Sequence, residues 1–139
     1  MNKWDQRFID LAAFIASWSK DTTKVGAVIV DDQKRVVSTG YNGFPRGTCD
    51  DELPRERKLL RVLHAESNAI DFAYRDITGC TLYVTHPPCA QCMARIIQTG
   101  ITRVVFTGEL KPDWGPSTEE ARWMAAEAGI TVERFETGA

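Results

Sequence analysis

The chain has 139 residues, which fits one domain, because domains of this size bury roughly two-thirds of the surface of the unfolded chain. Its 43% hydrophobic residues supply a core and argue against disorder. The 17 Lys and Arg residues nearly balance the 19 Asp and Glu residues, unlike the basic excess typical of nucleic-acid or membrane-surface binding. The longest apolar run, Leu11 to Ala16, is too short to span a membrane. We therefore expect a soluble, cytoplasmic single-domain protein (1–139) without a nucleic-acid or membrane partner.

A helix and a β-hairpin are expected to open the chain. Apolar residues recur at helical spacing between positions 4 and 18, which predicts a helix with one buried face. Residues 25–30 and 35–39 are short β-branched stretches separated by a polar turn, which predicts an antiparallel hairpin. The glycine- and proline-rich stretch 40–47 then predicts an irregular loop whose backbone can approach a ligand closely.

A second helical region is expected to begin at Pro54 and to break before His64. Its later part takes an apolar face from Ala69, Phe72 and Ala73 and ends at Gly79.

Strands and helices alternate in the rest of the chain. The expected elements are a strand at 81–85, a helix from 89 to 98 or 99, a strand at 103–107, a helix capped by Ser117-x-x-Glu120 that ends at Gly129, and a strand at 130–135. Two consecutive β-α-β crossovers after a hairpin predict an α/β fold with helices on both faces of a mixed, about five-stranded sheet.

The four cysteines divide into a pair and two single residues. Cys89 and Cys92 form a C-x-x-C pair, whereas Cys49 and Cys80 stand alone and are more typical of loop or buried positions than of metal ligands. The sequence shows no dense cysteine framework, so we expect reduced thiols. Taken alone, a C-x-x-C pair is as compatible with a structural or redox role as with a catalytic one.

The segments His64-Ala65-Glu66 and Pro88-Cys89-Ala90-Gln91-Cys92 each lie where a helix is expected to begin. Thiolate and imidazole groups are preferred ligands of zinc, and cysteines three residues apart in a first helical turn can both reach one ion. His64, Cys89 and Cys92 are therefore the predicted ligands of a Zn²⁺ ion. Glu66, two residues from His64, is the predicted catalytic proton shuttle.

Three protein ligands leave one tetrahedral position for water, which is typical of a catalytic zinc site. We expect Pro87 and Pro88 to direct His86 away from the ion, and Cys80 lies across a strand. With His86 as the only spare histidine, a second, structural zinc site is not expected. The alternative is a noncatalytic, zinc-stabilised interaction domain, which requires four protein ligands and no open position.

The pattern H-x-E followed by P-C-x-x-C is the signature of zinc-dependent deaminases. The sequence resembles the cytidine/deoxycytidylate deaminase superfamily, and its segments SKD…TKVGAVIV, GYNGFPRG and HAESNAI resemble deoxycytidylate (dCMP) deaminases over about residues 17 to 108. The resemblance implies a three-layer α/β/α cytidine-deaminase-like fold, commonly a homohexamer. It also implies zinc-dependent hydrolysis of dCMP to dUMP and ammonia, which supplies dUMP for thymidylate synthesis.

The resemblance also assigns substrate contacts. Backbone groups at Ala65 and Pro88 would orient the amino group of the base, and Asn42 in GYNG would bind the sugar unless it only stabilises its own loop. Arg75, in FAYR on the helix expected to carry Glu66, would meet the 5′-phosphate unless it is a solvated helix residue.

Further phosphate candidates are Lys20, Lys24 and Arg46. Many dCMP deaminases are activated by Mg²⁺-dCTP and inhibited by dTTP, with the GYNG region near the effector site. By resemblance, Asn42, Gly43 and Arg46 face either such an effector or the substrate, and the sequence does not separate the two.

Two departures from the family pattern concern the pocket. SKDTTKVGA is one residue shorter than the common SKDPxTKVGA, and FTGELKPDW lacks the tyrosine that covers the base in many relatives, with Trp114 or Phe106 as its replacement.

The alternatives within the superfamily are a bifunctional dCTP/dCMP deaminase and a cytidine, guanine or tRNA adenosine deaminase. The near-neutral charge disfavours the tRNA reading, because RNA affinity depends on basic patches.

Overall fold

The computed structural model describes residues 2–49, 52–108 and 115–136. Its strands form one five-stranded sheet in the order β2-β1-β3-β4-β5. The hairpin strands pair antiparallel, β1 also pairs antiparallel with β3, and β3, β4 and β5 run parallel. This arrangement confirms the predicted mixed sheet. The strands are β1 (Gly26–Val30), β2 (Val36–Tyr41), β3 (Thr81–Val84), β4 (Arg103–Phe106) and β5 (Thr131–Arg134).

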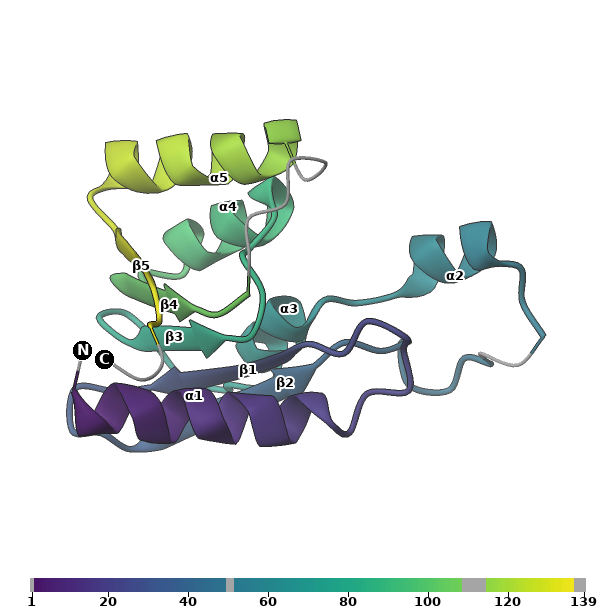
Figure 1. The fold of residues 1–139 in the computed structure, drawn as a ribbon, viewed down its shortest axis with the longest axis horizontal. Helices are drawn as coiled ribbons and strands as arrows, with labels where there is room; N and C mark the ends of the chain where they lie inside the picture. Colours follow the sequence, from purple (N-terminus) through teal and green to yellow (C-terminus); the bar gives the residue numbers. More distant parts are fainter. Residues whose placement is uncertain (1, 50–51, 109–114, 137–139) are drawn as a thin grey trace.

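Helices cover both faces of the sheet, as the alternating pattern predicts (Figure 1). The first helix lies along one face, the third and fourth lie on the other, and the fifth packs outside the fourth. The second helix stands away from the sheet at the end of an extended arm. The helices are α1 (Lys3–Ala16), α2 (Arg55–Arg61), α3 (Ala65–Asp71), α4 (Ala90–Gln98) and α5 (Gly115–Ala128).

Alternate residues of the central strands fill two hydrophobic cores, because successive side chains of a strand point to opposite faces. One core lies between α1 and the sheet and contains Phe8, Ile9, Ala12, Val28, Val30, Tyr83, Val105 and Phe135. The other joins α3, α4 and α5 to the opposite face through Ala27, Ile29, Ala65, Ala69, Leu82, Val84, Met93, Ile96, Val104, Phe106, Ala121 and Ala125. The sheet is therefore covered on both sides, which gives the predicted three-layer α/β/α fold.

Glycine allows α3 to approach β2 closely. A Cβ atom on Gly40 would lie 2.5 Å from both the carbonyl oxygen of Ala65 and the backbone nitrogen of Ala69. The Ser38 hydroxyl donates a 2.6 Å hydrogen bond to the Ala69 carbonyl, and the Asn68 amide donates to the Tyr41 carbonyl at 2.8 Å. These contacts determine where α3 begins relative to the sheet.

Two predicted helix boundaries are wrong. The helix expected to run to Gly79 ends at Asp71, because Phe72 caps it and Tyr74 takes a left-handed φ of 52°. Phe72 is exposed instead of contributing to an apolar face. The helix expected to be capped by Ser117 already begins at Gly115, so Ser117 lies inside its first turn. Within the described part of the chain, no helix combines the length and apolarity needed to cross a membrane.

Candidate metal centre and active-site cleft

Two helices begin at the predicted metal centre. His64 is the N-cap residue of α3, Cys89 is the N-cap residue of α4, and Cys92 lies in the first turn of α4. Cys89 follows the loop at the carboxyl end of β3, where Thr85 bonds to Gly26 at the start of β1 through both its backbone and its hydroxyl. The sheet thereby positions the loop that carries the cysteines beside the start of α3.

The three predicted ligands form one compact group. The His64 Nδ1 atom lies 3.2 Å from the Cys92 Sγ atom and 3.6 Å from the Cys89 Sγ atom. Zn–N bonds of about 2.0 Å and Zn–S bonds of about 2.3 Å at a tetrahedral angle require N to S separations of about 3.5 Å. All three ligand atoms lie within 4.8 Å of one another. The donor set and its spacing therefore fit zinc.

The electrostatics of the group favour metal binding. A hydrogen bond from Cys92 lowers the pKa of Cys89 to about 4, and His64 acts in the same direction. The interaction with Cys89 in turn raises the pKa of His64. The thiol of Cys92 has a raised pKa, because it donates to Cys89 and is buried. A second thiolate in this position requires compensation by positive charge, which a divalent cation supplies.

Glu66 lies beside the ligand group as a buried carboxyl, only 4% exposed. Burial raises its pKa to about 7, although a backbone hydrogen bond and the charge of His64 act in the opposite direction. A buried carboxyl with a perturbed pKa beside a metal centre is typical of a general acid/base. The geometry therefore supports the predicted chemistry of Glu66.

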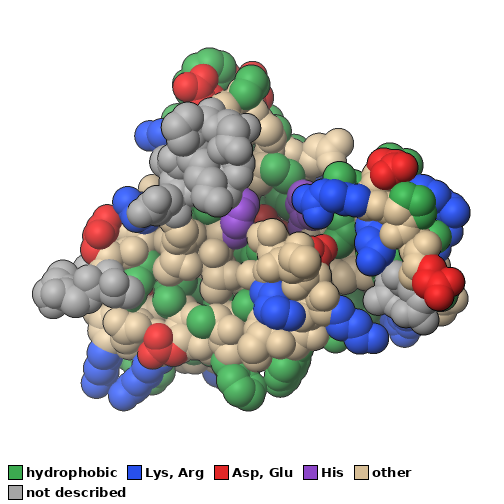
Figure 2. Space-filling view, turned by 45° about the vertical axis from the view of Figure 1, so that its right-hand side comes forward, with side chains coloured by type: hydrophobic (Ala, Val, Ile, Leu, Met, Phe, Trp, Pro, Cys, Tyr) green, Lys and Arg blue, Asp and Glu red, His purple; other side chains and the backbone are tan. Residues whose placement is uncertain are grey.

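The centre opens into a cleft of about 700 Å³ that is lined by His64, Ala65, Glu66 and Cys89 and by the loop after β2. Figure 2 shows the histidines at a hollow in the surface, with Lys and Arg side chains along one rim. Clefts of this size are typical of small-molecule sites.

The two histidines share this cleft. His86 also lines it but is not part of the ligand group, in agreement with the expectation that Pro87 and Pro88 direct it away from the ion. Its Nδ1 atom lies 3.1 Å from the Pro87 carbonyl oxygen.

The structure brings only some of the residues predicted to contact the base and the sugar into the cleft. Asn42 and Ala65 line the cleft, whereas Pro88 is buried and lines a second cavity of about 350 Å³ under α5. The Asn42 side chain accepts from the Val25 backbone at 2.9 Å and donates to the Thr23 carbonyl at 2.7 Å. Asn42 therefore anchors the loop, which was the alternative to sugar binding.

The residues predicted to contact a phosphate or an effector do not all lie in the cleft. Lys20, Gly43 and Arg46 line the cleft, whereas Lys24 does not and donates a hydrogen bond to the Ser19 carbonyl. Sequence reasoning missed Arg55 and Lys58 of α2, which also line the cleft. The only sequence signal for them is the basic stretch RERKLLR after Pro54.

Arg75 is not brought to this cleft. It lies beyond the end of α3, and its Nη1 atom is 3.7 Å from a carboxylate oxygen of Asp31 in the hairpin turn. Because β1 and β3 are antiparallel, this turn lies at the opposite end of the sheet from the cysteine loop. The placement of Arg75 on one helix with Glu66 was therefore wrong.

The two candidates for covering the base have different outcomes. Phe106 is buried in the core and lines the second cavity instead of the cleft. Trp114 lies outside the described residues.

A contact that the sequence did not indicate is made by Ser117, whose hydroxyl accepts a 2.9 Å hydrogen bond from the Ala90 backbone and so ties α5 to the start of α4.

Comparisons with known proteins agree with the geometry. Residues 2–108 match the model of the cytidine and deoxycytidylate deaminase zinc-binding region. A protein of Aliivibrio fischeri described as an uncharacterized deaminase in the luxG 3′ region is 46% identical over 95% of this chain and 93% of its own length. Human deoxycytidylate deaminase is 38% identical over 96% of this chain and 80% of its own length.

Solved structures give the same result. The dCMP deaminase of the cyanophage S-TIM5, in complex with dCMP and dUMP, is 27% identical and has a TM-score of 0.82 over 97% of this chain and 99% of that protein. The matched residues 2–108 include all three ligands and Glu66. The chain therefore belongs to the family of zinc-binding cytidine and deoxycytidylate deaminases.

Proposed function

We propose that residues 1–139 form one catalytic domain that hydrolyses dCMP to dUMP and ammonia and so supplies dUMP for thymidylate synthesis. The observation that carries this proposal is the buried carboxyl of Glu66 beside the ligand group of His64, Cys89 and Cys92, at the bottom of a cleft with basic residues on its rim. The relatives named deoxycytidylate deaminase and the cyanophage enzyme with bound dCMP and dUMP support this choice of substrate.

A zinc ion in this site would act as a Lewis acid that lowers the pKa of a water molecule toward neutrality. Glu66 accepts a proton from the attacking water and delivers it to N3 of the pyrimidine. After the water oxygen has bonded to C4, Glu66 takes the proton of the new C4 hydroxyl group and transfers it to the amino group, so that the C4–N bond breaks, ammonia leaves and the C4 carbonyl of dUMP forms. Because Glu66 is buried, bulk water does not compete for these proton transfers.

The wall of the cleft orients the substrate in this proposal. The backbone at Ala65, next to the proton shuttle, holds the exocyclic amino group of the base. Asn42 keeps its loop in place and contacts the sugar through the second hydrogen of its amide nitrogen. Pro88 supports the cysteine loop from the side of the second cavity instead of contacting the base.

Ammonia release from dCMP, dCTP, cytidine, guanine and a tRNA anticodon stem-loop tests this function. We expect the highest kcat/KM with dCMP. Comparable turnover of dCTP would instead identify a bifunctional enzyme, and turnover of only guanine or tRNA would assign the site to another branch of the superfamily. A zinc-replete protein inactive on all five substrates would support the noncatalytic interaction domain.

Regulation and assembly belong to the same proposal. We propose a cytoplasmic homohexamer that Mg²⁺-dCTP activates and dTTP inhibits, with Gly43 and Arg46 on the cleft wall as effector contacts. Initial rates with dCMP, with and without each nucleotide, test the regulation. Sedimentation equilibrium tests the assembly.

A further inference from the structure

One face of α2 forms part of the cleft wall. The cleft-lining residues of and just after this helix are Arg55, Lys58, Leu59 and Val62, at the i, i+3, i+4 and i+7 spacing of a single helical face. None of the residues of α2 is buried. The helix therefore contributes nothing to the core, and its inner face is available to a ligand in the cleft.

The cleft carries an excess of positive charge near this helix. Four cations line it, namely Lys20, Arg46, Arg55 and Lys58, and none forms an ion pair with another residue in the ranges 2–49, 52–108 and 115–136. The acidic residues that line it are Asp21 and Glu66. Glu66 is buried beside the metal ligands, so the cations are left to interact with a bound anion.

One of the four cations has a recorded side-chain contact. The guanidinium of Arg46 lies over the ring of Phe72, 5.2 Å from its centroid, and Lys20 is next in sequence to Asp21. Arg55 is next in sequence to Glu56, but within the described residues neither Arg55 nor Lys58 forms an ion pair or lies over an aromatic ring. They are also adjacent on one helical face, where two cations can contact one phosphate group.

We propose that Arg55 and Lys58 bind the 5′-phosphate of the nucleotide and so determine its preference over the nucleoside. This inference rests on the proposed function and deepens it. A guanidinium donates two parallel hydrogen bonds to a phosphate, and an ammonium adds a point charge. Arg75, the residue that the sequence indicated for this role, interacts with Asp31 at the other end of the sheet.

The test compares the two faces of α2. Arg55→Gln and Lys58→Gln remove the inner charges, and the matched control Arg57→Gln removes a charge that does not line the cleft. For the double variant we expect kcat/KM with dCMP to fall about 100-fold, and for each single variant about 10-fold, because hydrogen bonds to charged groups contribute this much. With deoxycytidine we expect less than about a 2-fold change. Arg57→Gln should resemble the wild type with both substrates.

Zinc content and circular dichroism establish that each variant is folded, and α2 has no buried residue whose loss would unfold the core. A double variant that keeps the wild-type preference for dCMP over deoxycytidine would overturn the inference and leave the proposed function intact. An equal loss with both substrates would also overturn it, because it would indicate a structural role of α2. A wild-type protein that does not deaminate dCMP would overturn the proposed function itself.

Discussion

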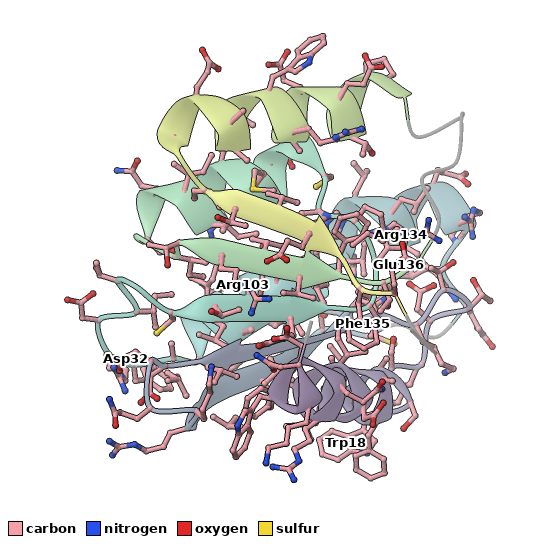
Figure 3. All side chains as sticks on the ribbon, turned by 60° about the vertical axis from the view of Figure 1, so that its left-hand side comes forward. Trp18, Asp32, Arg103, Arg134, Phe135 and Glu136 are labelled. Carbon is pink, nitrogen blue, oxygen red and sulfur yellow. The ribbon has the colours of Figure 1, made fainter. Side chains whose placement is uncertain are left out.

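The two faces of the sheet carry two charged clusters with opposite properties. On the α1 face, Arg103 binds both carboxylate oxygens of Asp5 at 2.9 Å and also contacts Glu133 at 2.7 Å. The Tyr83 hydroxyl donates to Asp5 at 2.6 Å. Figure 3 shows the position of Arg103 on this face. Each charge in this cluster has an opposite charge or a hydrogen-bond donor beside it.

On the α3 and α4 face, three metal-ligand atoms converge, no Lys or Arg within the described residues forms an ion pair with them, and a carboxyl is buried beside them. Paired groups such as Asp5 and Arg103 hold elements together, whereas an unbalanced convergent group such as His64, Cys89 and Cys92 requires a bound partner. The comparison therefore separates a structural cluster from a functional one by charge balance, since burial is common to both.

The largest effect should follow from removing a ligand. Cys92→Ser should abolish stoichiometric zinc binding and deaminase activity, because its buried thiolate is one of only three ligands in the group. Zinc per chain, measured by atomic absorption after dialysis, checks this prediction. Cys49→Ser is the matched control and should retain zinc, since Cys49 is exposed and does not belong to the group. Full zinc occupancy in Cys92→Ser would contradict the assignment.

Glu66→Gln should separate metal binding from chemistry. The amide has nearly the same shape as the carboxyl but cannot shuttle a proton, so we expect kcat to fall about 10² to 10⁴-fold with zinc content unchanged. Single-turnover ammonia release from dCMP measures the effect. Activity close to that of the wild type would show that another group transfers the proton.

Arg103→Met should affect stability and leave the zinc site unchanged. It leaves the buried Asp5 carboxylate without its cation, and we expect a loss of about 2 to 4 kcal/mol in the free energy of unfolding. Urea denaturation of the zinc-loaded protein measures this loss. Zinc content and kcat of the folded variant should match the wild type, and a loss of zinc would contradict the separation of the two clusters.

The same pair predicts a pH dependence. The hydrogen bonds and charge of Arg103 hold the pKa of Asp5 at about 2, below its usual value of 3.8. The native state therefore favours the ionised carboxyl, and the pair contributes stability above about pH 4 that is lost as the pH falls toward 2. The stability difference between the wild type and Arg103→Met should shrink over this range. A difference that stays constant down to pH 2 would contradict the ion pair.

A smaller effect is expected at Gly40, where α3 lies on β2. Alanine would place its Cβ atom 2.5 Å from the backbone of Ala65 and Ala69, and we expect a loss of about 1 to 3 kcal/mol together with weaker zinc binding as His64 moves. Gly115→Ala is the control, because no atom lies within 4 Å of its added Cβ. Thermal unfolding and a zinc-chelator competition measure the two effects. Unchanged zinc affinity in Gly40→Ala would show that the site tolerates a displaced α3.

Local patterns predicted the elements well where the physical cause is local. The alternation of strands and helices, the hairpin and the first turn of α4 follow from hydrophobic spacing and turn residues within a few positions. The end of α3 could not be predicted in this way, because no Gly or Pro interrupts the segment between Glu66 and Gly79. The chain leaves the helix at Phe72 and brings Arg75 to Asp31, a contact between distant segments.

The sequence by itself determined the chemistry of the metal centre, because the ligand types and the three-residue spacing of Cys89 and Cys92 are local properties of one helical turn. Only the tertiary structure decided which cations share the cleft with that centre. It placed Arg55 and Lys58 there and Arg75 at the far end of the sheet. The physical reason is that charge carries no positional information along the chain. A basic side chain contacts a ligand only where the packing of remote elements brings it.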